Sequence, residues 1–312
     1  MNDEQQRAIL TICLMAAFAE GGNDDRERAE IKRIAQSLSA GSAIDVGAIY
    51  QQVLLEKPDL PVIAAALTEA GHKQFAYEMA VGVCNADGAT SAAERDFLTE
   101  LARTLHLDAG AAQALTREAD ALASAPLAGA ALEGVVVSVG SANSAELDRM
   151  IIKASIINGA LELLPQSLAS MAIIPLQMKM VFGIGKAYGF ELDRGHIKDL
   201  LATLGVGLTS QYVEQFGRKL LGGLLGKIGG GLLGGVGSAG TGAAFSFATT
   251  YALGQVARRY YAGGRRIDAA GLQQTFASML GEAKQLQGQY SGQIAEQART
   301  FDVSKLLAMV KS

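Results

Sequence analysis

The chain has 312 residues, of which 49% are hydrophobic and 19% are charged. The net charge of −4 divides unevenly, because residues 1–125 carry 19 acidic and 10 basic side chains and residues 126–312 carry 12 and 17. No basic face interleaved with aromatics and no known nucleic-acid motif appears, so we expect no nucleic-acid partner. With two cysteines, the chain shows no disulfide framework. The polar start MNDEQQR does not indicate a signal peptide. We therefore expect a cytoplasmic N-terminal half.

Residues 3–122 have apolar side chains at three- and four-residue spacing, which predicts helices throughout. One phrase occurs twice. Residues 19–38 read AEGGNDDRERAEIKRIAQSL and residues 86–105 read ADGATSAAERDFLTELARTL, so that Ala19 aligns with Ala86 and Leu38 with Leu105. A repeat of this period indicates a duplicated helical unit. We expect about seven short helices that pack as two related halves.

Each copy of the phrase has an acid before a glycine and a second acid seven residues later: Glu20 and Glu27, then Asp87 and Glu94. One interpretation is structural, because Ser91 and Glu94 have the spacing of a capping box at a helix start. The other is a cation site in which the four carboxylates converge between the halves. Oxygen ligands without His or Cys suit Ca²⁺ or Mg²⁺. The sequence leaves both interpretations open.

Pro126 marks a boundary, and residues 126–149 suggest a linker, although VVVSV is a β-branched run. From residue 150 the chain is apolar, with Glu162 the single charge between Lys153 and Lys179. Pro165 and Pro175 divide this stretch into pieces shorter than the roughly 20 residues of a membrane span. We expect a buried hairpin or an interfacial element there, followed by helices at 176–190 and 196–221.

The longest uncharged run, Ile228–Ala257, is rich in glycine. Four glycines at four-residue spacing would form a small-residue face of the kind that packs helices in lipid: Gly222, Gly226, Gly230 and Gly234. Basic and aromatic residues that suit a membrane interface follow the run: Arg258, Arg259, Tyr260 and Tyr261. We favour membrane contact over a buried soluble hairpin for this segment. No strand precedes its glycines, so a nucleotide-binding loop is not indicated.

The three histidines are scattered, and no nucleophile or metal motif of an enzyme appears. We therefore expect a non-enzymatic protein.

The acid–glycine turns of residues 1–122 resemble the TerB-like family of tellurite-resistance and related bacterial proteins. This resemblance implies an all-helical duplicated domain, a stress-linked role near the membrane and a metal site at Glu20, Glu27, Asp87 and Glu94. The first copy departs from the pattern, since it has Glu-Gly where the second has Asp-Gly. Residues 150–275, with KASIINGALELLPQSLASM and ATTYALGQVARRYYAGG, resemble an uncharacterised bacterial helical domain that is often fused to Era-like GTPases.

The sequence thus predicts an all-α protein with four segments: a TerB-like acidic domain (1–125), a linker (126–149), a glycine-rich helical domain (150–268) and an amphipathic helical tail (269–312). The expected function is a membrane-associated sensor or scaffold in a stress response, at the cytoplasmic face of the bacterial inner membrane. Its expected partners are membrane lipid and further copies of itself. The alternative is a soluble self-assembling protein whose glycine-rich region forms a subunit interface.

Overall fold

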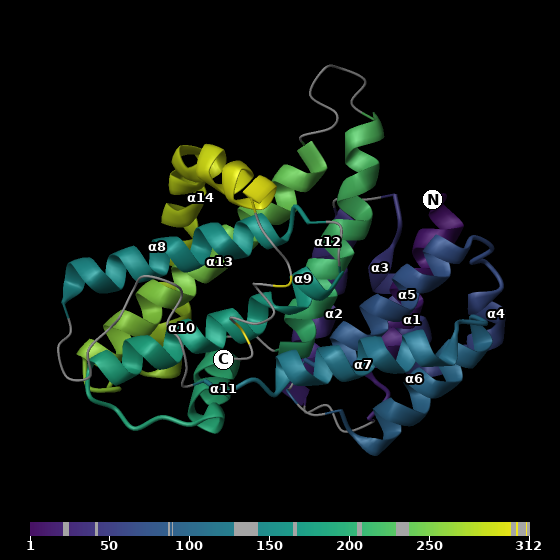
Figure 1. Ribbon diagram of the computed structural model, residues 1–312, viewed down its shortest axis with the longest axis horizontal. Coiled ribbons are helices and arrows are strands. Elements are labelled where there is room, and N and C mark those ends of the chain that lie inside the picture. Colours follow the sequence, from purple (N-terminus) through teal and green to yellow (C-terminus); the bar gives the residue numbers. More distant parts are fainter. Residues whose placement is uncertain are drawn as a thin grey trace. The chain divides into compact units, whose positions relative to one another are not determined.

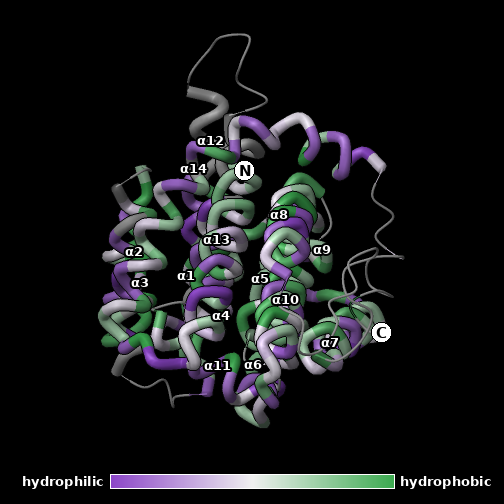
Figure 2. The backbone as a smooth tube through the Cα atoms, turned by 90° about the vertical axis from the view of Figure 1, so that its left-hand side faces the viewer, coloured by the Kyte–Doolittle hydropathy of each residue, from purple (hydrophilic) through white to green (hydrophobic). Residues whose placement is uncertain are grey.

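The computed structural model describes residues 1–20, 25–40, 43–86, 88, 90–127, 143–164, 167–204, 208–228, 237–300, 304 and 310. Most of the described residues are helical, and none of them forms a strand (Figure 1). The expected all-α class is therefore confirmed. Along most helices, hydrophobic and hydrophilic residues alternate (Figure 2), as expected for helices with one buried and one solvated side.

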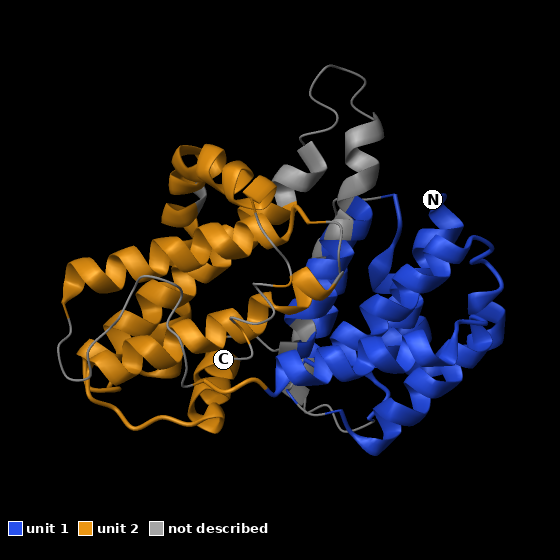
Figure 3. Ribbon diagram, viewed as in Figure 1, with its two compact units in different colours: residues 1–124, 207–239 blue, residues 125–206, 240–312 orange. Residues whose placement is uncertain are grey.

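The chain forms two compact units that do not follow chain order (Figure 3). Unit 1 comprises residues 1–124 and 207–239, and unit 2 comprises residues 125–206 and 240–312. The first division falls beside the boundary expected near residue 125. The segment at 207–239, which the sequence suggested to be part of a continuous domain over 150–268, is grouped with unit 1.

Unit 1 contains eight described helices: α1 (Asp3–Ala17), α2 (Asp25–Ala40), α3 (Val46–Glu56), α4 (Leu60–Ala64), α5 (Ala70–Cys84), α6 (Ala92–Thr104), α7 (Ala109–Ala123) and α12 (Leu208–Ile228). Helix α1 packs most extensively on α5, and α12 packs on α2, α1 and α5. The centre of the unit is apolar, with Ile12, Ile31 and Leu101 fully buried. Burial of such a core is the main stabilising contribution available to a helical bundle.

The helix bounds in unit 1 repeat in the register of the sequence phrase. When residue 19 is aligned with residue 86, both bounds of α1 coincide with those of α5. The starts of α2 and α6 also coincide in this alignment, and so do the ends of α3 and α7. A duplicated unit predicts this agreement.

Unit 2 contains α8 (Ser144–Leu161), α9 (Ser167–Met171), α10 (Ile173–Ala187), α11 (Arg194–Thr203), most of α13 (Gly237–Ala262) and α14 (Ala269–Thr300). Helix α8 packs on α14 and α10. Pro175 lies in the first turn of α10, where proline is tolerated because the backbone N–H there needs no helical acceptor.

The structure differs from the expected helices at one place and adds an observation at another. The single helix expected at 196–221 is instead two helices, α11 and α12, and Gly205 and Gly207 between them have low helix propensity. In addition, the segment Leu168–Ala187 is long and apolar enough to cross a membrane, but 78% of its most apolar window is buried inside the protein. A core helix passes the same test of length and composition.

Candidate functional sites

The second acid–glycine turn, between α5 and α6, closes with a capping box. The Ser91 backbone N–H donates to Glu94 Oε2 at 2.7 Å, and the Glu94 backbone N–H donates to Ser91 Oγ at 3.2 Å. Gly88 has φ +91°, a conformation that glycine adopts without steric strain. The structural interpretation of Glu94 is therefore confirmed. Its carboxylate satisfies a backbone donor that the start of α6 leaves without a helical partner.

A polar cluster that the sequence did not reveal fixes the same turn. The buried Thr90 hydroxyl lies 3.1 Å from Asn85 Oδ1 and 2.7 Å from Asp120 Oδ1, and Arg95 donates to the Thr90 carbonyl. Asn85 in turn donates to the Val81 carbonyl. These contacts join α5, α6 and α7. The sequence could not have predicted this cluster, because it depends on the tertiary contact between Thr90 and Asp120.

The four acids proposed as cation ligands are only partly within the described residues. Glu20 is exposed after the end of α1, and Glu94 is held in the cap. Asp87 and the side chain of Glu27 lie outside the described residues. Among the side chains that the structure does describe, no three of His, Cys, Asp and Glu gather closely enough to hold a metal ion. The cation site at Glu20, Glu27, Asp87 and Glu94 therefore stays a prediction.

Unit 1 has a groove between α6 and α7, with a volume of about 730 Å³. Its floor includes the Tyr77 ring, whose hydroxyl lies 3.0 Å from Thr116 Oγ1. The residues along it are Tyr77, Arg95, Leu98, Thr99, Ala102, Arg103, His106, Leu107, Ala109, Ala112, Gln113 and Thr116. Two arginines and a histidine thus line the groove, and none of its described lining residues is acidic.

A second groove of about 560 Å³ shares Arg103 and His106 with the first and adds Lys73. Its remaining lining is apolar or neutral, from Pro61 to Thr68 together with Thr104. His106 follows the end of α6 with φ +55°, where glycine is the usual residue. The Leu107 N–H donates back to the Ala102 carbonyl at 3.0 Å, which closes the helix end around that conformation.

The predicted membrane-contact residues belong to both units: Gly222 and Gly226 fall in unit 1, and residues 258–261 fall in unit 2. Gly222 and Gly226 are in α12, whereas Gly230 and Gly234 lie outside the described residues. Arg258 donates to Asp148 Oδ1 at 2.6 Å and to Ser144 Oγ at 3.2 Å within unit 2. This arginine therefore bridges α13 and α8.

The other residues after the uncharged run have distinct environments. Tyr261 is 2% exposed and packs beside Gly185 and the Phe190 ring, whose centroid is 5.4 Å away. Tyr260 is half-buried, and its hydrogen bond with Arg265 raises the pKa of that guanidinium. Arg259, Arg265 and Arg266 are exposed. Of the two tyrosines expected at a membrane interface, one thus belongs to the core.

Helix α13 buries polar as well as apolar side chains in unit 2. Asn158 Nδ2 and Gln177 Nε2 both donate to Thr250 Oγ1 at 3.0 Å. One turn away, Ser246 Oγ donates to Glu162 Oε1 at 3.0 Å. These contacts connect α13 to α8 and α10. The part of the uncharged run from 243 to 257 is therefore a core element of unit 2.

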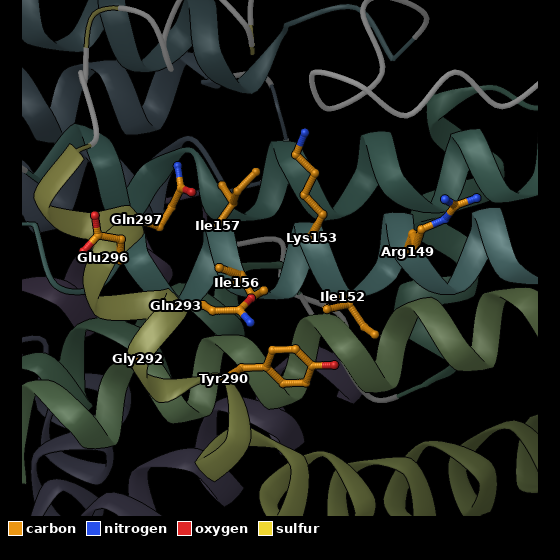
Figure 4. Close-up of a pocket in the computed structure, with 10 residues that line it drawn as sticks. All are labelled: Arg149, Ile152, Lys153, Ile156, Ile157, Tyr290, Gly292, Gln293, Glu296 and Gln297. Atoms are coloured by element: carbon orange, nitrogen blue, oxygen red, sulfur yellow. The ribbon is translucent and has the colours of Figure 1, made fainter.

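A further groove, of about 680 Å³, lies between α8 and α14 of unit 2 (Figure 4). The half-buried Ile152 and Ile156 of α8 point toward the α14 residues, which include Tyr290, whereas the amino group of Lys153 points away from them. Its rim carries both signs of charge, from Arg149 and Lys153 on α8 and Glu296 on α14.

Comparisons with known proteins give one finding. Residues 1–119 match the family described as "Protein of unknown function (DUF533)", and this range ends inside α7. No curated protein and no solved structure gives a significant match. The matched residues include the acid–glycine turn, its capping box and the groove between α6 and α7, so these features lie in the part of the chain that is similar to that family.

Proposed function

We propose that the protein is a non-enzymatic scaffold that attaches peripherally to an anionic membrane surface, at the cytoplasmic face of the bacterial inner membrane. The observation that carries the proposal is the exposure of Arg259, Arg265 and Arg266 around the turn from α13 to α14. A basic side chain near an anionic bilayer contributes about 1 kcal/mol to binding. Three in one turn would therefore hold the protein weakly, and binding would depend on salt.

Peripheral attachment agrees better than insertion with the surroundings of α13. The stretch from 243 to 257 has Phe247, Thr250 and Val256 fully buried. Thr250 accepts two hydrogen bonds from other helices of unit 2. Moving this helix into lipid would break those contacts. The stress-linked role implied by the TerB-like resemblance would then be exerted from the membrane surface.

Co-sedimentation of the full chain with liposomes tests this proposal. Vesicles containing phosphatidylglycerol should bind the protein, neutral phosphatidylcholine vesicles should not, and salt should release it because exposed charges are screened. The triple change Arg259→Gln, Arg265→Gln and Arg266→Gln should abolish binding. The matched control, Arg7→Gln, Lys32→Gln and Arg299→Gln, removes three exposed charges elsewhere and should leave most of it. Equal binding of both triple variants would contradict attachment through this turn.

A self-assembling protein is the second candidate, and α14 gives it a specific basis. Gly281, Gly288 and Gly292 are exposed, and a Cβ at any of them would meet no atom within 4 Å. Glycine inside a helix costs about 1 kcal/mol relative to alanine. No contact within the described part of the chain therefore explains them, and close approach of a second copy would. Sedimentation velocity tests this candidate, because a dimer that Gly288→Leu abolishes would support it and a monomer at high concentration would exclude it.

A further inference from the structure

The groove between α6 and α7 is lined by basic side chains, although the N-terminal segment that forms it is acidic as a whole. Residues 1–125 carry 19 acidic and 10 basic side chains. Yet this groove and its neighbour are lined by Lys73, Arg95, Arg103 and His106, and no acidic residue is among the described side chains that line them. Charges of one sign concentrated in a concave surface attract a ligand of the opposite sign.

The cationic side chains are arranged along a line. Arg95, Thr99 and Arg103 recur at four-residue spacing, so they lie along one side of α6. Eight residues of α-helix separate the two arginines by about 12 Å along the helix axis. The spacing suits a ligand with several acidic groups along its length.

The side of the groove formed by α7 has small side chains at its start and the polar Gln113 and Thr116 farther along. Helix α7 begins with Ala109-Gly110-Ala111-Ala112, and Ala109 and Ala112 line the groove. Their small side chains leave room above Leu98 and Leu107, which face the groove from α6 and the turn after it. A helix laid into this space would pack on both α6 and α7, as in helix-in-groove recognition.

We propose that the groove between α6 and α7 binds an acidic amphipathic helix of a partner protein. Its apolar side would cover Ala102, Leu107 and Ala109, and its carboxylates would lie beside Arg95 and Arg103. This site is independent of the exposed arginine turn in unit 2. A scaffold with both would hold a membrane surface through one unit and an acidic partner through the other.

The test uses the full chain and a defined probe: a fluorescein-labelled synthetic helix of about 15 residues, with leucines along one side and glutamates beside them. Binding is measured by fluorescence anisotropy. Arg103→Glu should weaken binding at least about tenfold, because it replaces an attraction by a repulsion. Ala109→Glu should have a similar effect, since it places a carboxylate in the groove. The matched control is Arg117→Glu, the same change at an exposed position of α7 that does not line the groove.

Each outcome has a defined meaning. Weaker binding by Arg103→Glu and Ala109→Glu but not by Arg117→Glu supports the proposal. A peptide in which lysines replace the glutamates should not bind. The proposal is overturned by equal binding of both peptides, by equal effects of all three variants, or by no binding at about 100 µM peptide, the lower end of useful affinities. A concentration-dependent dimer that Arg103→Glu dissociates would also overturn it, because a second copy would then be the occupant. Circular dichroism establishes that each variant is folded.

Discussion

Gly217 of α12 packs directly against Leu38 of α2, so closely that a Cβ at position 217 would overlap the Leu38 Cδ1 atom. Leu38 is 5% exposed, and the neighbouring Phe216 is 1% exposed. This contact makes α12 part of the core of unit 1, although α12 follows α7 only after four helices of unit 2. The absence of a side chain at 217 is what allows the two helices to approach.

The overlap in Gly217→Ala should cost about 1–3 kcal/mol, the usual effect of an added methyl group in a packed core, and the higher helix propensity of alanine should return about 1 kcal/mol, so we expect a net loss of up to about 2 kcal/mol in the free energy of unfolding. Alanine has the higher helix propensity, so propensity alone predicts the opposite sign. Urea unfolding followed by circular dichroism measures the change. Leu38→Ala alone should also destabilise the protein, because it leaves a cavity. In the Leu38→Ala background, however, Gly217→Ala should cost less, because the smaller side chain makes room. Stabilisation by Gly217→Ala alone would show that the contact is not tight.

Much of unit 1 follows from the sequence, because helices depend on local periodicity and caps. The spacing of Ser91 and Glu94 predicted a capping box at the start of α6, as one of two interpretations of these acids. The membership of α12 in unit 1 depends on its contact with Leu38, far away in the chain, and no periodicity encodes it. The groove is an intermediate case. The spacing of Arg95 and Arg103 is visible in the sequence, whereas the opening beside Ala109 and Tyr77 depends on how α5, α6 and α7 pack.

Thr250 should be the most sensitive polar position of unit 2. Thr250→Val keeps the shape of the side chain but leaves the amide donors of Asn158 and Gln177 without their shared acceptor. Each buried donor left unsatisfied costs about 1–3 kcal/mol. We expect a loss of at least about 2 kcal/mol in urea unfolding, and Thr250→Ser should retain most of the stability. The matched control is Thr249→Val, since within the described residues the Thr249 hydroxyl bonds to nearby carbonyls of its own helix. Similar losses for Thr249→Val and Thr250→Val would contradict the role of these cross-helix contacts.

The two buried cysteines predict a loss of stability at alkaline pH. Burial raises the pKa of Cys13 to about 12, and burial, Glu94 and Cys13 together raise the pKa of Cys84. Above pH ~9 the unfolded thiols lose their protons while the folded ones keep them, so the unfolded state is favoured increasingly. The free energy of unfolding should fall between pH ~9 and ~11, by up to about 1.4 kcal/mol per pH unit for each thiol.

Cys13→Ala separates this effect from the titration of tyrosines, several of which also have raised pKa values. The variant should be less stable at neutral pH because it leaves a small cavity. Its stability should nevertheless decline less steeply between pH ~9 and ~11 than that of the native protein. An unchanged slope would mean that the thiol of Cys13 ionises in the folded state as readily as in the unfolded one.

The acid–glycine turns allow a direct test of cation binding. If Glu20, Glu27, Asp87 and Glu94 hold Ca²⁺ or Mg²⁺, millimolar concentrations should raise the melting temperature, because the ion binds the folded state alone. Asp87→Asn should abolish that increase. Glu94→Gln, which can still accept the hydrogen bond from Ser91, should change the melting temperature little without the ion. A melting temperature that does not respond to either ion in the native protein would leave helix capping as the role of these acids.

His106 should be a position where binding and stability have opposite requirements. A non-glycine residue in the left-handed region costs about 1–2 kcal/mol, and His106 has φ +55°. His106→Gly removes this strain but makes the unfolded chain more flexible, so we expect a net gain of about 0.5–1 kcal/mol in urea unfolding. His106→Ala keeps the strain and should give no gain. Both substitutions remove the imidazole where the two grooves meet, and both should weaken binding of the acidic helix. Equal stability of the glycine and alanine variants would show that the backbone at residue 106 is not strained. Undiminished peptide binding by both variants would show that the imidazole does not contact the acidic helix.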